Sequence, residues 1–166
     1  WCCLVGSEMC IRDSYKLRGQ HSDNDQRFII EKAKIHKVKY HTREFDISKI
    51  NFKKSQSVQM KCRQLRYKWF NELSKKYGYD FILTAHHLND SIETFFINIF
   101  RGTGIEGLTG IPIKRDKFIR PLLFATKNSI LEYAKKNDVH YREDKSNESK
   151  SYKRNKIRSD LIPIIS

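Results

Sequence analysis

The 166-residue chain has few cysteines, and they are not spaced as a disulfide framework or a metal site requires. Cys2, Cys3 and Cys10 lie near the N-terminus and Cys62 stands alone, with no CxxC pair. This pattern excludes a disulfide-rich scaffold and gives no sign of a zinc or iron–sulfur centre. We expect a protein of the reducing cytoplasm.

Long hydrophobic runs are also missing. No apolar stretch approaches the roughly 20 residues of a membrane-spanning helix, so we expect a soluble protein with no membrane partner. Residues 1–14, WCCLVGSEMCIRDS, lack the charged region and the cleavage site of a signal peptide, and they show no helical or strand periodicity. The chain has no internal repeat and no GxxxxGK(S/T) or GxGxxG motif.

Acidic residues are scarce relative to basic ones. The chain has 19 Asp and Glu against 33 Lys and Arg, a formal net charge of +14. In so small a protein this excess favours a polyanionic partner such as RNA, DNA or an acidic membrane surface. A lysine-rich surface from an AT-rich genome would give the same excess, so charge alone does not decide between them.

Helical and strand patterns alternate along the chain, which predicts an α/β domain with a parallel sheet and helices on its faces. The composition, 39% hydrophobic and 12% aromatic, is sufficient for one such core. The periodicity predicts helices over 22–36, 57–77, 91–100 and 127–137 and a last one from about 152, with strands over 37–47 and 80–87.

The most informative stretch is LTAHHLNDSIETFFINIFRGTGIEGLTGIP, Leu83 to Pro112. Asp90 could cap the helix that follows, with Glu93 at its third position, as in a capping box. Alternatively, both carboxylates lie on one helical face at the carboxyl end of a buried strand, where open α/β sheets bind ligands. In that position they could hold a metal ion or an ammonium group.

The residues around these carboxylates allow the same two interpretations. His86 and His87 face opposite ways if the strand runs through both, so one is a core histidine and the other faces the ligand crevice. Gly102, Gly104, Gly107 and Gly110 exceed what a helix stop needs and permit close approach of the backbone to a ligand. The neighbouring Arg101 suits an anionic group.

Five segments, taken together, resemble the signature motifs of tRNA(Ile)-lysidine synthetases, members of the PP-loop ATP pyrophosphatase superfamily. The family's AHHxDDxxET…RGxGxxGLxGMP element corresponds to Thr84–Pro112. The resemblance covers nearly everything from residue 15 onward, in the family's order. The other four segments are LRGQHSDND (17–25), CRQLRYKWF (62–70), IRPLL (119–123) and EDKSNESKSYKRNKIRSDLIPII (143–165).

This resemblance implies a three-layer, Rossmann-like domain of the adenine nucleotide α-hydrolase type. It also implies a ligase that forms a C–N bond, with ATP and Mg²⁺ as cofactors. The expected substrates are a tRNA(Ile) with a CAU anticodon and free L-lysine. ATP adenylates the C2 oxygen of the wobble cytidine, and the lysine ε-amine then displaces AMP to give lysidine. The oligomeric state stays open, a homodimer included.

The resemblance also implies roles for individual residues. Asp90 and Glu93 would hold the lysine ammonium or, at Asp90, Mg²⁺, while His86 would contact the activated intermediate. Several arginines would stabilise negative charge, and the basic cluster at Arg154, Lys156 and Arg158 suits an RNA backbone. The expected sites are catalytic (His86, Asp90, Glu93, Arg66), ATP-binding (His86, Arg101, Gly102, Gly104) and tRNA-binding (Arg18, Arg120, Arg154, Arg158).

The sequence departs from the family at three points. No SGGxDS loop precedes LRG, and residues 1–14 resemble a translated sequencing-adapter tail rather than the family. Residues 15–166 would then be a partial catalytic N-terminal domain, truncated at its first strand and without the family's C-terminal tRNA-binding domains. Asn89 replaces the first acidic residue of the usual DD pair. We therefore expect this chain to bind ATP poorly and to be inactive as it stands.

Two alternatives stay open. A tRNA 2-thiocytidine synthetase shares an HHxxDxxET-like segment, but it uses paired cysteines for an iron–sulfur cluster, and Cys62 is the only cysteine in the matching region. A catalytically dead, basic tRNA-binding module would also carry these motifs. Lysine-dependent release of AMP would exclude that module.

Overall fold

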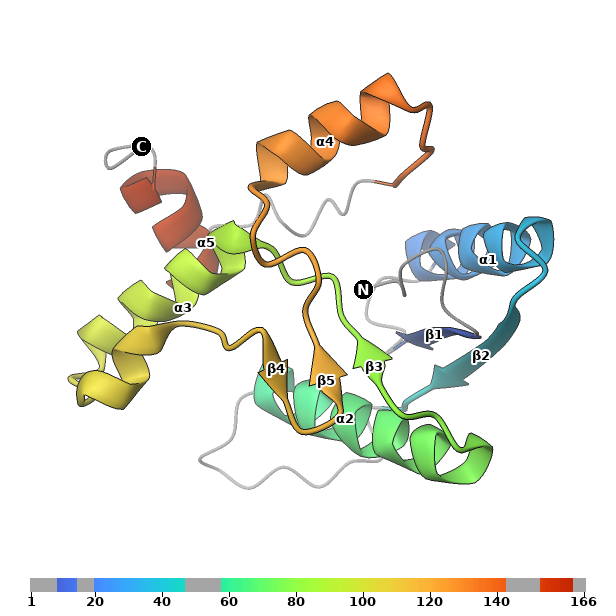
Figure 1. Ribbon diagram of the computed structural model, residues 1–166, viewed down its shortest axis with the longest axis horizontal. Coiled ribbons are helices and arrows are strands. Elements are labelled where there is room, and N and C mark those ends of the chain that lie inside the picture. Colours follow the sequence, from blue (N-terminus) through green and yellow to red (C-terminus); the bar gives the residue numbers. More distant parts are fainter. Residues whose placement is uncertain (1–8, 15–19, 47–57, 143–152, 163–166) are drawn as a thin grey trace. The chain divides into compact units, whose positions relative to one another are not determined.

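The computed structural model describes residues 9–14, 20–46, 58–142 and 153–162, and every structural statement below refers to them (Figure 1). The chain divides into two compact units. Unit 1 comprises Trp1–Ala85 with Asp116–Ile119, and unit 2 comprises His86–Arg115 with Arg120–Ser166. The described helices include none that is long and apolar enough to cross a membrane.

Unit 1 begins with a parallel β–α–β arrangement. Strand β1 (Met9–Ser14) pairs with β2 (Lys39–Glu44) in parallel, with Cys10 opposite Tyr40 and Ile11 opposite His41. Helix α1 (Gln20–Ile35) connects the two, because parallel strands need a crossover between them. Residues 1–14 show no strand periodicity, yet β1 occupies the last six of them. A strand therefore precedes the LRG segment in the chain.

The remainder of unit 1 contains a long helix and a second parallel strand pair. Helix α2 (Val58–Tyr77) ends at Gly78, whose φ of +75° suits glycine at a helix terminus. Strand β3 (Ile82–Leu83) runs parallel to β5 (Phe118–Ile119). The predicted strand over 80–87 is thus much shorter than expected, and it ends before the two histidines.

The core of unit 1 is apolar and aromatic. Ile11, Trp69, Phe70, Leu73, Ile82 and Phe118 form one buried cluster, and Cys10, Ile29 and Ala33 form another. On α1 and α2, Ile29 and Trp69 are buried, whereas Ile35 and Met60 are 61% and 52% exposed. Both lie near a helix end.

Unit 2 contains the remaining elements. Helix α3 (Leu88–Phe100) leads into a short 3₁₀ helix, η2 (Ile105–Thr109), and strand β4 (Lys114–Arg115). Helix α4 (Lys127–Lys136) is capped by Thr126, whose hydroxyl accepts the Ser129 N–H at 3.1 Å. Near the C-terminus, α5 (Lys153–Lys156) continues into η4 (Ile157–Leu161), a π-helical turn.

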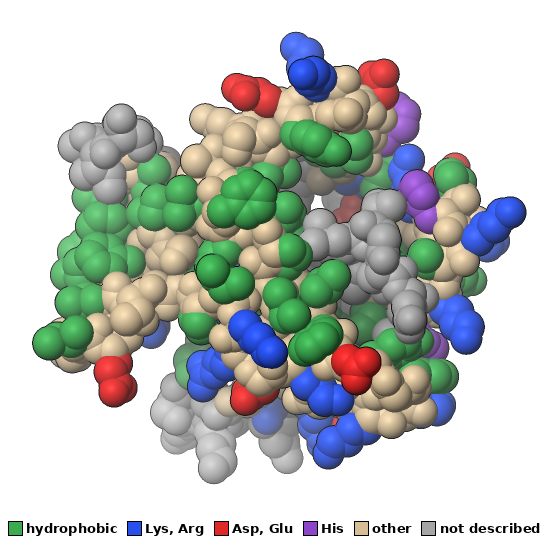
Figure 2. Space-filling view, viewed as in Figure 1, with side chains coloured by type: hydrophobic (Ala, Val, Ile, Leu, Met, Phe, Trp, Pro, Cys, Tyr) green, Lys and Arg blue, Asp and Glu red, His purple; other side chains and the backbone are tan. Residues whose placement is uncertain are grey.

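Helix α3 only partly buries the apolar face that its helical spacing indicates. Its hydrophobic residues recur at helical spacing, but Ile99 and Phe100 are 42% and 69% exposed. Hydrophobic side chains gather over α3 at the surface (Figure 2). The residues that α3 does bury are Asp90 and Glu93. Enclosed carboxylates on a helix require partners, and these partners define the candidate site.

Candidate functional site

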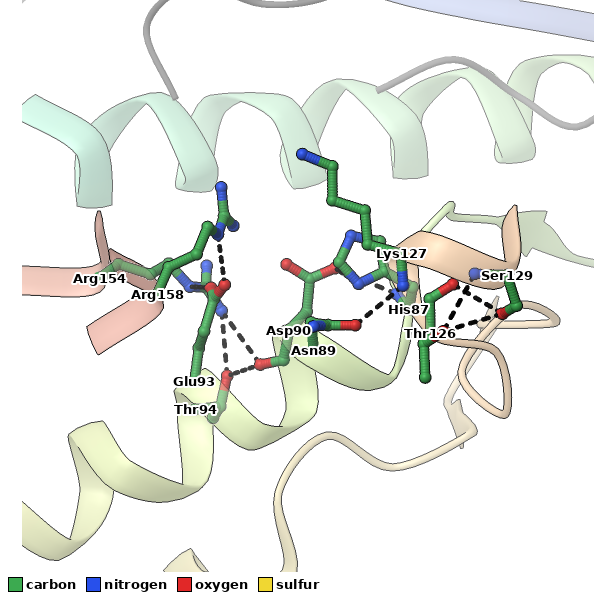
Figure 3. Close-up of polar contacts among 10 residues, drawn as sticks. All are labelled: His87, Asn89, Asp90, Glu93, Thr94, Thr126, Lys127, Ser129, Arg154 and Arg158. Carbon is green, nitrogen blue, oxygen red and sulfur yellow. Dashed lines mark hydrogen bonds and ion pairs between the residues drawn. The ribbon is translucent and has the colours of Figure 1, made fainter. Parts of the chain in front are cut away.

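The candidate site is the first half of α3 together with the α5–η4 segment (Figure 3). Asp90 is 7% exposed and Glu93 is completely enclosed, at 0%. Their i, i+3 spacing brings both carboxylates to the buried side of the helix, as predicted. The two side chains nevertheless have different partners.

Asp90 completes the start of the helix. The N-cap residue is His87, one turn earlier than expected, so Asp90 occupies the third helical position that was predicted for Glu93. One Asp90 oxygen, Oδ2, accepts the His87 backbone N–H at 3.0 Å and lies 3.5 Å from His87 Nδ1. The other oxygen, Oδ1, has no hydrogen-bond partner in the described part of the chain, so it is available to a ligand.

Glu93 is held by two arginines. Arg158 Nε donates to Glu93 Oε1 at 2.6 Å, and Arg154 Nε lies 2.9 Å from Oε2. The arginines are four residues apart, so they share one face of their helical segment and reach the same carboxylate. A buried carboxylate requires compensation of this kind, because an unpaired charge in the interior is strongly unfavourable.

Thr94 provides a further contact for Arg154. Arg154 Nη2 donates to Thr94 Oγ1 at 3.0 Å, and the Thr94 hydroxyl donates to the Asp90 carbonyl oxygen at 2.8 Å. The same nitrogen lies 3.5 Å from that carbonyl. Sequence analysis did not select Thr94, although the threonine directly follows Glu93 in the family's ET pair.

The cluster brings two guanidinium groups to the single carboxylate of Glu93. The side chains of Arg154 and Arg158 are 36% and 27% exposed, so both also face solvent. Guanidinium groups bind phosphate and carboxylate through paired hydrogen bonds. The arrangement can therefore receive an anion.

His86 is the core histidine of the pair. It is 2% exposed, while the side chain of His87 is 19% exposed. The prediction that one histidine is packed and the other more accessible agrees with this. A contact between His86 and an activated intermediate stays a prediction. Arg66 lies half-buried on α2 in unit 1, and Arg18 lies outside the described residues.

The glycine-rich loop begins at the opposite end of α3. Arg101 is the C-cap and Gly102 has a φ of +67°. Eleven residues separate Arg101 from Asp90, about 16 Å along a helix. The structure therefore does not bring the expected ATP-binding residues Arg101, Gly102 and Gly104 beside Asp90. Their contact with ATP stays a prediction.

Packing within unit 2 accounts for two of the loop's glycines. A Cβ at Gly107 would collide with the Thr103 side chain, and one at Gly110, where φ is +72°, would collide with Ser91 Oγ. Ser91 Oγ accepts the Ile111 N–H at 3.0 Å, which fixes the loop to α3. A Cβ added at Gly104, in contrast, would meet nothing within 4 Å. Close approach to a ligand is therefore not required to explain Gly107 and Gly110.

Arg120 has a buried position. It is 4% exposed, and its Nη1 donates to the Pro112 carbonyl oxygen at 2.7 Å. It forms no ion pair with any described residue, and its buried Nε has no hydrogen-bond partner among them. Arg120 thus fixes the end of the glycine-rich loop. Its contact with tRNA stays a prediction.

Asn89, the departure from the family's acidic pair, also has a local role. Its side-chain oxygen Oδ1 accepts the Lys127 N–H at 2.9 Å, at the start of α4. An aspartate could accept this hydrogen bond equally well, so the contact needs only the side-chain oxygen. The replacement leaves Asp90 and Glu93 unaffected.

The described residues do not fit a magnesium site. Mg²⁺ requires oxygen ligands in octahedral geometry. No group of three or more His, Cys, Asp or Glu side chains in the described part of the chain could hold a metal ion. Both oxygens of Glu93 face guanidinium groups, which repel a divalent cation. Asp90 alone is insufficient, so the Mg²⁺ role predicted for it has no support in this geometry.

Comparisons with known proteins identify the family. A family model described as "PP-loop domain" matches residues 11–165. The tRNA(Ile)-lysidine synthase of Porphyromonas gingivalis strain W83 is 39% identical over 153 residues, 92% of this chain and 34% of that protein. The tRNA(Ile)-lysidine synthase of Chlorobaculum tepidum is 37% identical over 98% of this chain and 48% of that protein. These matches confirm the resemblance drawn from the motifs.

The length of the match is informative. The chain spans about a third to a half of the length of these two curated relatives.

Among solved structures, the U34-tRNA thiolase NcsA from Methanococcus maripaludis, with its 4Fe–4S cluster, superposes with a TM-score of 0.63. That match has 18% identity and covers 81% of this chain and 48% of the thiolase. At this identity the likeness shows the fold alone, and it confirms the predicted Rossmann-like α/β class.

Proposed function

The chain belongs to the PP-loop domain family, and from this premise we propose that it is part of a tRNA(Ile)-lysidine synthetase. The observation that carries the proposal is the similarity, at 37–39% identity over nearly the whole chain, to relatives that bear this name. The net charge of +14 supports an RNA substrate. ATP and tRNA as substrates agree with a cytoplasmic protein.

The proposed reaction has two steps. The C2 oxygen of the wobble cytidine in a CAU anticodon attacks the α-phosphorus of ATP, and the bond to the β-phosphate breaks to release pyrophosphate. The neutral ε-amine of free L-lysine then attacks C2, the C2–O bond breaks, and AMP leaves. The amine loses its proton as the new C–N bond forms. Recognition of an unstacked loop base is typical of proteins that bind RNA by sequence.

The geometry of unit 2 supports a division of these tasks. The partly exposed guanidinium groups of Arg154 and Arg158 suit a phosphate of the RNA or of the nucleotide. The accessible oxygen of Asp90 suits the ammonium group of lysine. Glu93, which pairs with the two arginines, and Asp90, which suits the cation, lie within one turn of α3. No step is assigned to Mg²⁺, because the described residues form no site for it.

We further infer that residues 15–166 correspond to part of the catalytic domain. The motifs that carry the resemblance all lie there. The rest of the relatives' length would supply further RNA contacts, and the SGGxDS loop would supply the phosphate cradle. The role of residues 1–14 is decided by sequencing the source DNA upstream of the Tyr15 codon. An SGGxDS-encoding sequence there would show that they are foreign to the gene.

The activity test measures lysine transfer directly. The 166-residue chain, and the same chain extended by any upstream SGGxDS segment, are incubated with ATP, radiolabelled L-lysine and a tRNA(Ile) transcript with a CAU anticodon. We expect lysine-dependent AMP release and labelled tRNA from the extended chain. A transcript with uridine at the wobble position is the matched control and should stay unlabelled.

Two outcomes would contradict the proposal. Adenylation of the tRNA that is resolved by a sulfur donor, and not by lysine, would favour a 2-thiocytidine synthetase. RNA binding without any AMP release from the extended chain would favour a catalytically dead module. Substitution of Asp90 by asparagine should abolish labelling in the active form without abolishing RNA binding.

A further inference from the structure

Glu93 is the most enclosed carboxylate of the candidate site. It is 0% exposed, and each of its oxygens faces a different arginine, at 2.6 Å and 2.9 Å (Figure 3). A substrate could reach this carboxylate only by displacing Arg154 or Arg158. Removing a partner from a buried charge pair is strongly unfavourable. The prediction that Glu93 binds the lysine ammonium therefore conflicts with its surroundings.

Charge leads to the same conclusion. An ammonium group at Glu93 would lie beside two guanidinium groups, and like charges at such distances repel. At Asp90 the situation differs, because Oδ1 accepts no hydrogen bond from the described residues. The two carboxylates, although three residues apart, are therefore not equivalent.

Thr94 adds a second point of attachment for one of the arginines. Arg154 Nε forms an ion pair with Glu93 that lacks hydrogen-bond geometry, and Arg154 Nη2 donates a hydrogen bond to Thr94, so two of the three nitrogens have a partner. Its third nitrogen, Nη1, has no hydrogen bond to any described residue. A guanidinium held on two sides presents its remaining N–H groups in a fixed direction, as recognition of a phosphate requires.

We propose that Glu93 and Thr94 are positioning residues that hold Arg154 and Arg158 for a phosphate group, and that Asp90 alone meets the lysine ammonium. This inference rests on the proposed function for the identity of the cation. The phosphate belongs either to the RNA backbone or to the nucleotide and its pyrophosphate. Both have the same chemistry, and the experiment below distinguishes them.

The first measurement is hydrogen exchange of residues 153–162 in the full chain. Glu93→Gln keeps the size of the side chain and removes its charge, so exchange there should accelerate about a hundredfold. Glu132→Gln, an exposed residue of α4, removes the same charge and should leave exchange unchanged. Unchanged exchange in Glu93→Gln would overturn the positioning role.

A second pair of variants keeps the test decisive if Glu93→Gln does not fold. Thr94→Val has nearly the same volume but lacks the hydroxyl, while Thr94→Ser retains it. We expect faster exchange at residues 153–162 in the valine variant and recovery of the original rate in the serine variant. Equal rates in the two variants would exclude a role for the hydroxyl.

The third measurement separates the two charges. Titrations use L-lysine, inorganic pyrophosphate and an anticodon stem-loop RNA. Glu93→Gln should weaken binding of the phosphate-bearing probe about tenfold and leave lysine affinity unchanged. Asp90→Asn should do the reverse. An effect on pyrophosphate assigns the phosphate to the nucleotide, and an effect confined to the RNA assigns it to the RNA backbone.

The outcomes separate this inference from the proposed function. Loss of lysine binding in Glu93→Gln, with exchange and phosphate affinity unchanged, would overturn the inference alone. Absence of lysine binding by the parent chain and its extended form would count against the proposed function. The exchange rates of Glu93→Gln and Thr94→Val would still decide whether these residues position the arginines.

Discussion

The two compact units bury different kinds of side chain. Among the described residues, the buried side chains of unit 1 are mainly apolar, with Trp69, Phe70 and Phe118 at the centre of its larger cluster. In unit 2 the apolar buried residues are Ala134 and Ile157. The polar ones outnumber them: His86, Asp90, Glu93 and Arg120.

The two kinds of burial contribute differently to the stability of the fold. Burial of apolar surface stabilises a fold by about 25 cal/mol per Å², whereas buried charges add little net stability even when they are paired. Unit 2 buries charged groups although they add little net stability. These groups lie within motifs that resemble those of lysidine synthetases. We infer that unit 2 carries the ligand contacts.

The largest effect should come from the core of unit 1. Trp69 is 6% exposed and contacts Phe70 and Phe45 through its ring. Trp69→Ala should lower the free energy of unfolding by about 3–5 kcal/mol, measured by urea denaturation. Phe124→Ala, at a side chain that is 82% exposed, is the control and should change it by less than about 0.5 kcal/mol. An equal loss of unfolding free energy in the two variants would show that Trp69 does not stabilise the core of unit 1 more than an exposed residue does.

A backbone substitution in unit 2 should have the next largest effect. Gly110 has a φ of +72°, and a Cβ there would collide with Ser91 Oγ. Gly110→Ala should therefore lower the free energy of unfolding by about 2–3 kcal/mol. Gly104→Ala, where the backbone is ordinary and space is open, should be nearly neutral. If both variants unfolded alike, the loop would not be fixed to α3 as described.

A substitution at Arg120 tests how much a buried charged residue of unit 2 contributes to the free energy of unfolding. Arg120→Met removes the hydrogen bond to the Pro112 carbonyl and should lower the free energy of unfolding by about 2 kcal/mol. Arg115→Met, an exposed position, should change it by less than about 0.5 kcal/mol. A loss as large as that of Trp69→Ala would show that polar burial stabilises unit 2 as strongly as apolar burial stabilises unit 1.

The smallest effect concerns His41, a half-buried histidine of unit 1. Burial lowers the pKa of His41 from its ordinary value of 6.5, and the charges of Lys76 and Lys39 lower it further. The unfolded chain therefore takes up this proton at a higher pH than the folded one. The stability contribution is complete above pH 6.5 and is lost as the pH falls from 6.5 towards the lower folded pKa.

The test is a comparison of unfolding free energies at about pH 7.5 and 5.5. His41→Phe retains a ring against Tyr77 and should lose less stability on acidification than the parent chain, by under about 1 kcal/mol. His36→Gln, an exposed histidine, is the control. An identical loss in His41→Phe and the parent would exclude His41 as the source.

The sequence predicted the helices well, because they depend on local periodicity, and the alternation of helices with strands predicted the parallel pairing. Helix α2 begins one residue after its predicted start, and α4 ends one residue before its predicted end. Local patterns were less successful at the ends of elements. The N-cap of α3 is His87, a residue that rarely takes this position, so the start was placed at Asp90.

The acidic pair of the site was predictable, but its partners were not. Asp90 and Glu93 carry a recognisable spacing, whereas Arg154 and Arg158 are more than 60 positions away in the chain. A contact at such separation depends on how the chain folds, and no local pattern encodes it. The exposure of Ile99 and Phe100 was unpredictable for the same reason, since helical spacing indicates a face but not what covers it.

The shared carboxylate has a consequence for how this site tolerates mutation during evolution. If either Arg154 or Arg158 is lost, one oxygen of the buried Glu93 loses its partner, which is unfavourable, but the remaining arginine still supplies a counter-charge. Loss of Glu93 leaves two guanidinium groups without their common counter-ion, and no second carboxylate replaces it among the described contacts of Arg154. Sequence drift should therefore be asymmetric, with single arginine replacements accumulating before any change at the glutamate.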